Sequence, residues 1–182
     1  SGLGANVYIL DINMDNLRYL DDVMPANVRT IHSNRHILTD LLPQIDLLIG
    51  AVLVVGAKAP KLIDRKLLSI MKPGSVAVDV SVDQGGCMET TKPTTHQNPT
   101  FVEEGITHYC VANMPGAVPY TSTIALSNAT FHYIKELAND GISILKKNKA
   151  LLSGLNTFNG EITHSAVSSS FNLNYTDPLN LL

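Results

Sequence analysis

The chain has 182 residues, of which 45% are hydrophobic and 16% are charged, and its formal net charge is −3. This composition is typical of a globular protein with a buried core, and it excludes extensive disorder. Lys and Arg do not cluster, which argues against nucleic acid or an anionic membrane as partner, so we expect a small molecule or another protein chain.

Residues 5–112 alternate short β-rich runs with helical patterns, which is typical of βαβ units that build a parallel sheet. We expect strands at 5–11, 28–33, 46–54 and 75–82, and helices at 14–24, 35–45 and 60–71. The strands are almost wholly apolar, as they are where helices cover both faces of a sheet. The longest apolar run, 47–57, is too short to cross a bilayer, so the sequence predicts no transmembrane segment.

The residue composition and hydrophobic pattern of the chain change after residue 82. Segment 83–105 is polar and rich in turn-forming residues, which predicts a long loop, and loops of this length usually carry function. A last strand is expected at 107–114, a long helix at 120–140, and two further helical stretches between 142 and 182. This final segment is too short to form its own core, so we expect it to dock on another domain.

Gly2 and Gly4 raise the question of a phosphate-binding loop at the start of the chain. A dinucleotide fingerprint needs a strand, G-x-G-x-x-G and then a helix, whereas here a strand follows the glycines, so Gly4 is expected to end a helix. Asp11 stands at the carboxyl end of that strand, where an acidic residue accepts hydrogen bonds from an adenosine ribose and favours NAD over NADP. A turn or N-cap role for Asp11 is the alternative.

The other chemically active residue types show no site pattern. Cys87 and Cys110 do not form a C-x-x-C pair, and the six histidines lack metal-ligand spacing, so no metal is expected. The run Gly85-Gly86-Cys87 predicts a tight turn that lets the backbone approach a ligand, rather than a nucleophilic cysteine. Asp79 lies inside an apolar strand, and the sequence leaves its role open.

Three long motifs carry a resemblance to a known family. They are LLIGAVLVVGAKAP (47–60), MKPGSVAVDVSVDQGGCMETTKPTTHQNPTF (71–101) and HYCVANMPGAVPYTSTIALSNAT (108–130). In this order, and within a similarity that covers residues 2 to about 165, they resemble bacterial NAD-dependent L-alanine dehydrogenases. The resemblance implies a Rossmann-type, doubly wound parallel sheet lacking its first strand. It also implies an NAD-binding domain over 1–118, followed over 119–182 by a connecting helix and the C-terminal helices of a substrate domain.

The resemblance also implies an oxidoreductase of L-alanine catabolism, which converts L-alanine to pyruvate and ammonia with hydride transfer to NAD. Asp83 corresponds to the catalytic aspartate beside the nicotinamide and the substrate, and Asp11 corresponds to the ribose-binding acid. The other implied cofactor contacts are Ser33 on the adenosine side, Val52 and Leu53 along the dinucleotide, and Asn113 and Met114 at the nicotinamide end.

By the same resemblance, the chain is expected to lack the amino-terminal half of the enzyme. That half would include the first strand, the glycine loop, the catalytic histidine, and the arginine and lysine that bind the substrate carboxylate, so we expect the chain alone to be inactive. Its expected location is the cytoplasm, because no signal peptide or disulfide framework is evident. A homo-oligomer, a hexamer in the family, is expected in part through the helix at 119–140.

Two other functions stay open on the sequence. The NAD-binding subunit of a proton-translocating nicotinamide nucleotide transhydrogenase shares the fold and similar motifs, but its pattern favours Glu where Asp83 stands, so VDQGG favours the dehydrogenase. The second alternative is a truncated, non-catalytic nucleotide-binding module, which the lack of a glycine loop would favour.

Overall fold

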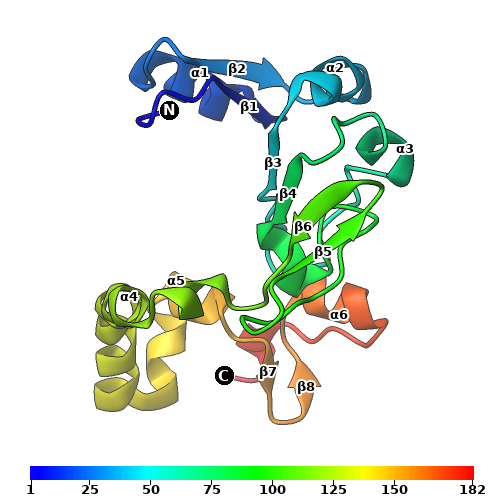
Figure 1. Cartoon of the computed structure of the whole chain (residues 1–182). Helices are drawn as coiled ribbons and strands as arrows, with labels where there is room; N and C mark the ends of the chain where they lie inside the picture. Colours follow the sequence, from blue (N-terminus) through cyan, green and yellow to red (C-terminus); the bar gives the residue numbers. More distant parts are fainter.

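The computed structural model describes residues 1–182, which form a C-shaped molecule (Figure 1). The upper arm carries β1 (Val7–Asp11), α1 (Met14–Val23), β2 (Val28–His32) and α2 (Arg35–Leu41). The centre carries β3 (Leu47–Gly50), α3 (Arg65–Leu68), β4 (Val76–Asp79), β5 (Thr100–Glu103) and β6 (Ile106–Tyr109). The lower part carries α4 (Pro119–Asp140), α5 (Lys149–Ser153), β7 (Thr157–Phe158), β8 (Glu161–Ile162) and α6 (Ser165–Phe171). No helix has the length and apolar character needed to cross a membrane.

The parallel strands are divided between two sheets. β1 and β2 pair only with each other, whereas the central sheet has the order β3-β4-β6-β5, in which β3, β4 and β6 are parallel and β5 is antiparallel. The predicted α/β class is confirmed. The division falls between β1 and β3, where the common doubly wound order places its first strand, so each of these two strands has one edge without a partner.

Asparagine side chains cap α1 and α2, whose first residues agree with the predicted helix starts at 14 and 35. The Asn13 side chain accepts hydrogen bonds from the amides of Asp15 and Asn16 at the start of α1, and the Asn34 side chain accepts one from the Ile37 amide at the start of α2. Asn is among the preferred N-cap residues because its short side chain satisfies amides that have no helical acceptor. The upper arm therefore consists of two βα units, β1–α1 and β2–α2, and the paired strands β1 and β2 end next to each other.

The helix predicted over 60–71 is present only as α3 (Arg65–Leu68), so the prediction is wrong at both ends. Residues 60–64 are not helical, because the amides of Leu62 and Ile63 both donate to the Cys87 carbonyl and Ile63 forms a parallel bridge with Met88. α3 begins only at Arg65, after Asp64 caps it by accepting from the Leu67 amide at 2.8 Å. A tertiary pairing with a distant segment therefore overrides the local helical pattern.

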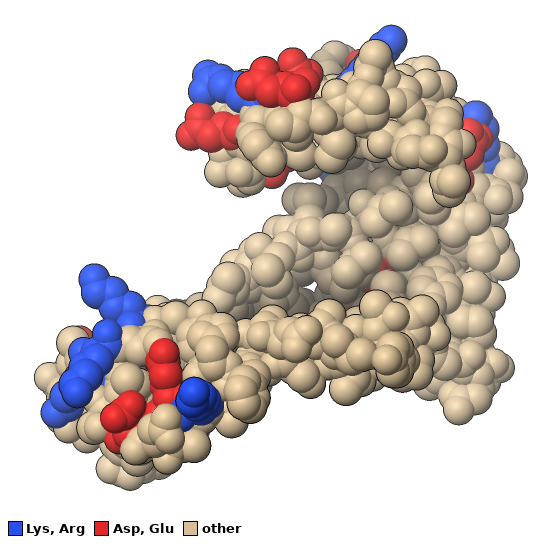
Figure 2. All heavy atoms as spheres, turned by 90° about the vertical axis from the view of Figure 1, so that its left-hand side faces the viewer, with Lys and Arg blue, Asp and Glu red and all other residues tan.

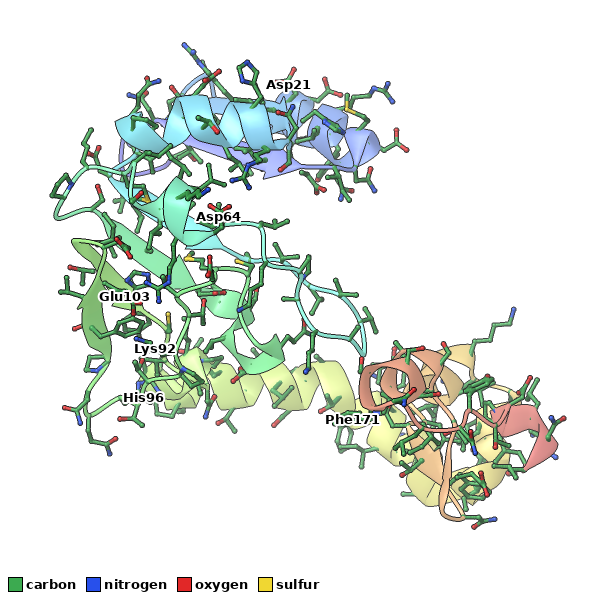
Figure 3. All side chains as sticks on the ribbon, turned by 90° about the vertical axis from the view of Figure 1, so that its right-hand side faces the viewer. Asp21, Asp64, Lys92, His96, Glu103 and Phe171 are labelled. Carbon is green, nitrogen blue, oxygen red and sulfur yellow. The ribbon has the colours of Figure 1, made fainter.

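The segment predicted as a loop at 83–105 contains β5. Phe101 of this strand stacks on His108 of β6 with ring centroids 4.8 Å apart, and Lys92 Nζ donates to Glu103 at 2.5 Å. Arg65 also pairs with Glu103, which ties α3 to the same strand; Figure 3 shows Lys92 and Glu103 beside the central sheet. The strands predicted at 46–54 and 107–114 are correspondingly shorter, and the β7–β8 hairpin was not predicted.

The buried core lies in the central sheet and the segments that cover it. Its nine buried members are Leu42, Ile63, Leu67, Leu68, Met71, Ala77, Cys87, Met88 and Ile106. By contrast, α1 buries only Leu17 and α4 buries no residue. The part of the chain that follows β4 is thus anchored in the best-packed region of the molecule, and the arms expose apolar surface.

Candidate functional site

The predicted site residues of the central sheet follow the carboxyl ends of three neighbouring parallel strands. Val52 and Leu53 come after β3, Asp83 comes after β4, and Asn113 and Met114 come after β6. Ligands of open α/β sheets bind at this edge. Figure 2 shows a hollow face between the two arms, with few charged side chains on its walls. The structure therefore places these five residues at one edge of the central sheet.

Asp11 and Ser33 lie together at the carboxyl ends of the other two parallel strands. The Ser33 amide donates to the Asp11 carbonyl at 2.9 Å. The Asp11 carboxylate accepts from the Asn13 amide at 2.9 Å and from the Asn16 side-chain amide at 3.3 Å, and these bonds hold the pKa of Asp11 below its usual range. Asp11 is only half-buried, so its ionised carboxylate keeps acceptor sites for hydroxyl groups of a ligand. Both the N-cap environment and a ribose role fit this geometry.

Asp83 is exposed on the 3₁₀ helix η2 (Val80–Gln84), and none of its carboxylate oxygens is held by a hydrogen bond or ion pair. Beside it, the Val52 carbonyl accepts from the Ser81 hydroxyl at 2.7 Å, which joins the chain after β3 to the chain after β4. The Val52 side chain packs against the core, and Leu53 is 72% exposed. This edge thus offers a free carboxylate next to an apolar surface.

Asn113 has a left-handed backbone with φ +56°, which is uncommon for a residue other than glycine. Its carbonyl lies 3.0 Å from Nε2 of His96, which lies near the start of α4 in Figure 3. A Cβ at Gly116 would lie 3.1 Å from the same His96 nitrogen, so the turn that carries Met114 is closely fitted to the histidine. No sequence pattern indicated this position of His96, because a contact between an imidazole ring and a distant backbone carbonyl leaves no local signal.

The contacts of His108 are structural. His108 is fully buried, with Nε2 2.8 Å from the Thr90 hydroxyl and Nδ1 2.9 Å from the Ile106 carbonyl. Gly85 and Gly86 have φ of +89° and +75°, which confirms the predicted tight turn. No group of three or more His, Cys, Asp and Glu side chains is arranged to hold a metal ion.

Cys87 is expected to react slowly as long as the chain is folded. Burial, followed by the nearby Asp79 carboxylate, raises the pKa of Cys87 to about 11, so its thiolate fraction at pH 8 is on the order of one in a thousand. Burial also raises the pKa of Cys110. A colorimetric thiol reagent at pH 8 should therefore label neither cysteine readily in buffer and both in denaturant; rapid labelling of the folded chain would contradict this. Because the folded-state pKa is raised, this contribution to stability is present below the unfolded pKa and is lost as the pH rises toward 11.

Comparison with known proteins gives consistent matches over nearly the whole chain. The family model described as "Alanine dehydrogenase/PNT, C-terminal domain" matches residues 1–165. An alanine dehydrogenase of Staphylococcus haemolyticus is 53% identical over 177 residues, which are 96% of this chain and 48% of that protein. A solved L-alanine dehydrogenase structure matches with a TM-score of 0.81 and 47% identity, over 94% of this chain and 47% of that one. A transhydrogenase from Sinorhizobium meliloti matches with a TM-score of 0.58 at 18% identity, over 77% of this chain and 47% of that one, which is a likeness of fold alone. The chain spans about half the length of the curated relatives it matches.

Proposed function

Because the chain belongs to the alanine dehydrogenase/PNT C-terminal domain family, we propose that it supplies the NAD-binding part of an L-alanine dehydrogenase. The proposed enzyme oxidises L-alanine to pyruvate and ammonia. The observation that carries the proposal is the free, exposed carboxylate of Asp83 at the carboxyl edge of parallel strands. The chain that holds it is 53% identical in sequence to an alanine dehydrogenase.

The residues at the two sheet edges fit a dinucleotide. Asp11 has an ionised, half-exposed carboxylate that can accept hydrogen bonds from the ribose hydroxyls, and Ser33 is joined to Asp11 through its backbone amide. On the central sheet, Val52 and Leu53 would contact the middle of the dinucleotide, and the turn with Asn113 and Met114 would contact its nicotinamide end. The sequence contains no G-x-G-x-x-G run, so we propose that another polypeptide segment contacts the pyrophosphate.

NAD, when bound, would accept the hydride from Cα of L-alanine. The oxidised substrate is a cationic iminium, to which water adds before the C–N bond breaks and ammonia leaves. A carboxylate fixed beside this carbon stabilises the positive charge and can orient the attacking water. Asp83 is the residue of this chain that we assign to that role, because its oxygens are free and it stands at the ligand-binding edge.

The division of the chain into two domains is also part of the proposal. We place the NAD-binding domain at 1–118 and assign 119–182 to a connecting helix and the C-terminal part of a substrate domain. The start of α4 at Pro119 and its lack of buried residues support a boundary there. We further propose a cytoplasmic location, which fits the two free cysteines.

A chimera tests the proposed activity. The amino-terminal half of the Staphylococcus haemolyticus enzyme would precede these 182 residues, and NADH formation would be followed with L-alanine, with D-alanine as the control. We expect turnover that depends on both L-alanine and NAD. A folded chimera that binds NADH but does not turn over would instead favour a non-catalytic nucleotide-binding module.

We also propose that the chain forms a homo-oligomer through α4. Tyr120, Ile124, Phe131 and Ile134 are exposed and recur at helical spacing, so they form one apolar stripe along the helix. Such a stripe is typical of a surface that packs against another helix, and the same stripe of a second copy is self-complementary.

Changing one residue of this stripe should dissociate the oligomer. Phe131→Lys places a charge at the centre of the stripe, and Ala129→Lys adds the same charge to an exposed position on the opposite face of α4. Light scattering after gel filtration should show a lower mass for the first variant and the parent mass for the second. A monomeric parent chain, or an unchanged mass for Phe131→Lys, would contradict the proposal.

A further inference from the structure

Asp79 is a carboxylate with no solvent exposure at the end of β4. Its Oδ1 accepts from the Ser81 amide at 3.0 Å, and its Oδ2 accepts from the Cys87 amide at 2.9 Å and the Met88 amide at 3.3 Å. The Thr91 hydroxyl also donates to Oδ2. One buried side chain thus receives hydrogen bonds from both ends and the middle of segment 81–91, which contains Asp83.

The same segment is fitted closely to its surroundings. A Cβ at Gly50, the residue paired with Asp79 across the sheet, would lie 2.3 Å from the Cys87 sulfur. A Cβ at Gly86 would lie 2.4 Å from Thr91 Cγ2. Lys61 Nζ donates to the Gly85 carbonyl at 2.5 Å and to the Met88 carbonyl at 2.9 Å, which holds the turn from its outer side. There is little room for segment 81–91 to move as long as the contacts to Asp79 are made.

The buried carboxyl group of Asp79 depends on these contacts. No Lys or Arg side chain pairs with it; its partners are three backbone amides, one hydroxyl and the Cys87 thiol, whose sulfur lies 3.6 Å from Oδ1. A buried carboxylate without a cation is costly unless its oxygens are saturated by donors, and hydrogen bonds to an ionised acceptor are stronger than neutral ones. Any shift of the segment would leave the carboxylate under-satisfied, so the arrangement resists displacement.

We propose that Asp79 is a positioning residue for Asp83. By holding the amides of Ser81, Cys87 and Met88 and the hydroxyl of Thr91, it fixes η2 so that the Asp83 carboxylate faces the ligand-binding edge. This inference rests on the proposed alanine dehydrogenase activity, and it assigns to Asp79 no contact with substrate or cofactor.

Hydrogen exchange of the 182-residue chain tests the structural part without any activity. Thr91→Val keeps the shape of the side chain but removes the hydroxyl that donates to Asp79, whereas Thr91→Ser keeps the hydroxyl. We expect amides of 81–91 to exchange about tenfold faster in Asp79→Asn and Thr91→Val, with amides of β1 and β2 unchanged, because hydrogen bonds between Asp79 and this segment are lost. In Thr91→Ser, the amides of 81–91 should exchange as slowly as in the parent chain. Unchanged exchange in both Asp79→Asn and Thr91→Val would overturn the proposal.

Kinetics of the chimera test the part that acts through Asp83. We expect Asp79→Asn to lower kcat by about ten- to a hundredfold, because a small displacement of a reacting group has an effect of that size, with NADH affinity unchanged. Asp79→Asn combined with Asp83→Ala should be no slower than Asp83→Ala alone, since both changes remove the same function.

Three kinetic outcomes would count against the assignment. An unchanged kcat in a variant with fast loop exchange would show that the segment does not position the reaction. Losses that multiply in the double variant would show that Asp79 acts independently of Asp83. An inactive parent chimera would overturn the proposed activity and, with it, the proposed effect of Asp79 on the reaction through Asp83, whereas the exchange measurement would still decide whether Asp79 fixes segment 81–91.

Discussion

Asp83→Ala in the chimera is expected to lower kcat for L-alanine oxidation by about a hundred- to a thousandfold, the usual effect of removing one preorganised group that stabilises transition-state charge. The carboxylate is exposed on η2 and carries no internal hydrogen bond, so its removal should leave the fold and the neighbouring contacts intact. NADH affinity, measured by fluorescence titration, should change by less than about twofold, since Asp83 is assigned to the substrate side.

Asp83→Glu is the matched variant for this prediction. It keeps the negative charge but moves it outward by one methylene. The rate of Asp83→Glu should therefore lie between that of Asp83→Ala and that of the parent chimera. Asp22→Ala, on the exposed face of α1, controls for the general effect of losing one acidic residue. Turnover of Asp83→Ala near the parent rate would refute the assigned role.

The succession of strands and helices along the chain could be predicted because each βα unit has a local sequence pattern. The apolar runs that became β1 to β4 are short-range signals, and they indicated which carboxyl ends carry Asp11 and Asp83. The same signals located the edge at which the candidate site lies. They could not show that the parallel strands would divide into two sheets, because pairing depends on which strands are neighbours in space.

The errors share one physical cause, which is tertiary pairing. Residues 60–64 have the pattern of a helix start, but the amides of Leu62 and Ile63 donate to the Cys87 carbonyl. Phe101 has the pattern of a loop residue, although it stacks on His108. The contacts of Asp79 belong to the same class, since its donors lie up to twelve residues further along the chain and meet it only after Gly85 and Gly86 turn the backbone. A sequence pattern shows that such an aspartate is unusual in a strand but not what satisfies it.

Asp11→Ser is expected to weaken NAD binding by about ten- to a hundredfold and to reduce the discrimination against NADP, because an ionised acceptor is lost and a 2′-phosphate is no longer repelled. The ratio of kcat/KM for the two cofactors in the chimera measures both effects. Asp11→Asn separates them, since it keeps a carbonyl acceptor without the charge. Asn16→Ala removes a neighbouring hydrogen bond to Asp11 while leaving the carboxylate in place, so it should keep the parent preference. If Asp11→Ser also kept that preference, the carboxylate would only organise the start of α1, which is the N-cap reading of the same geometry.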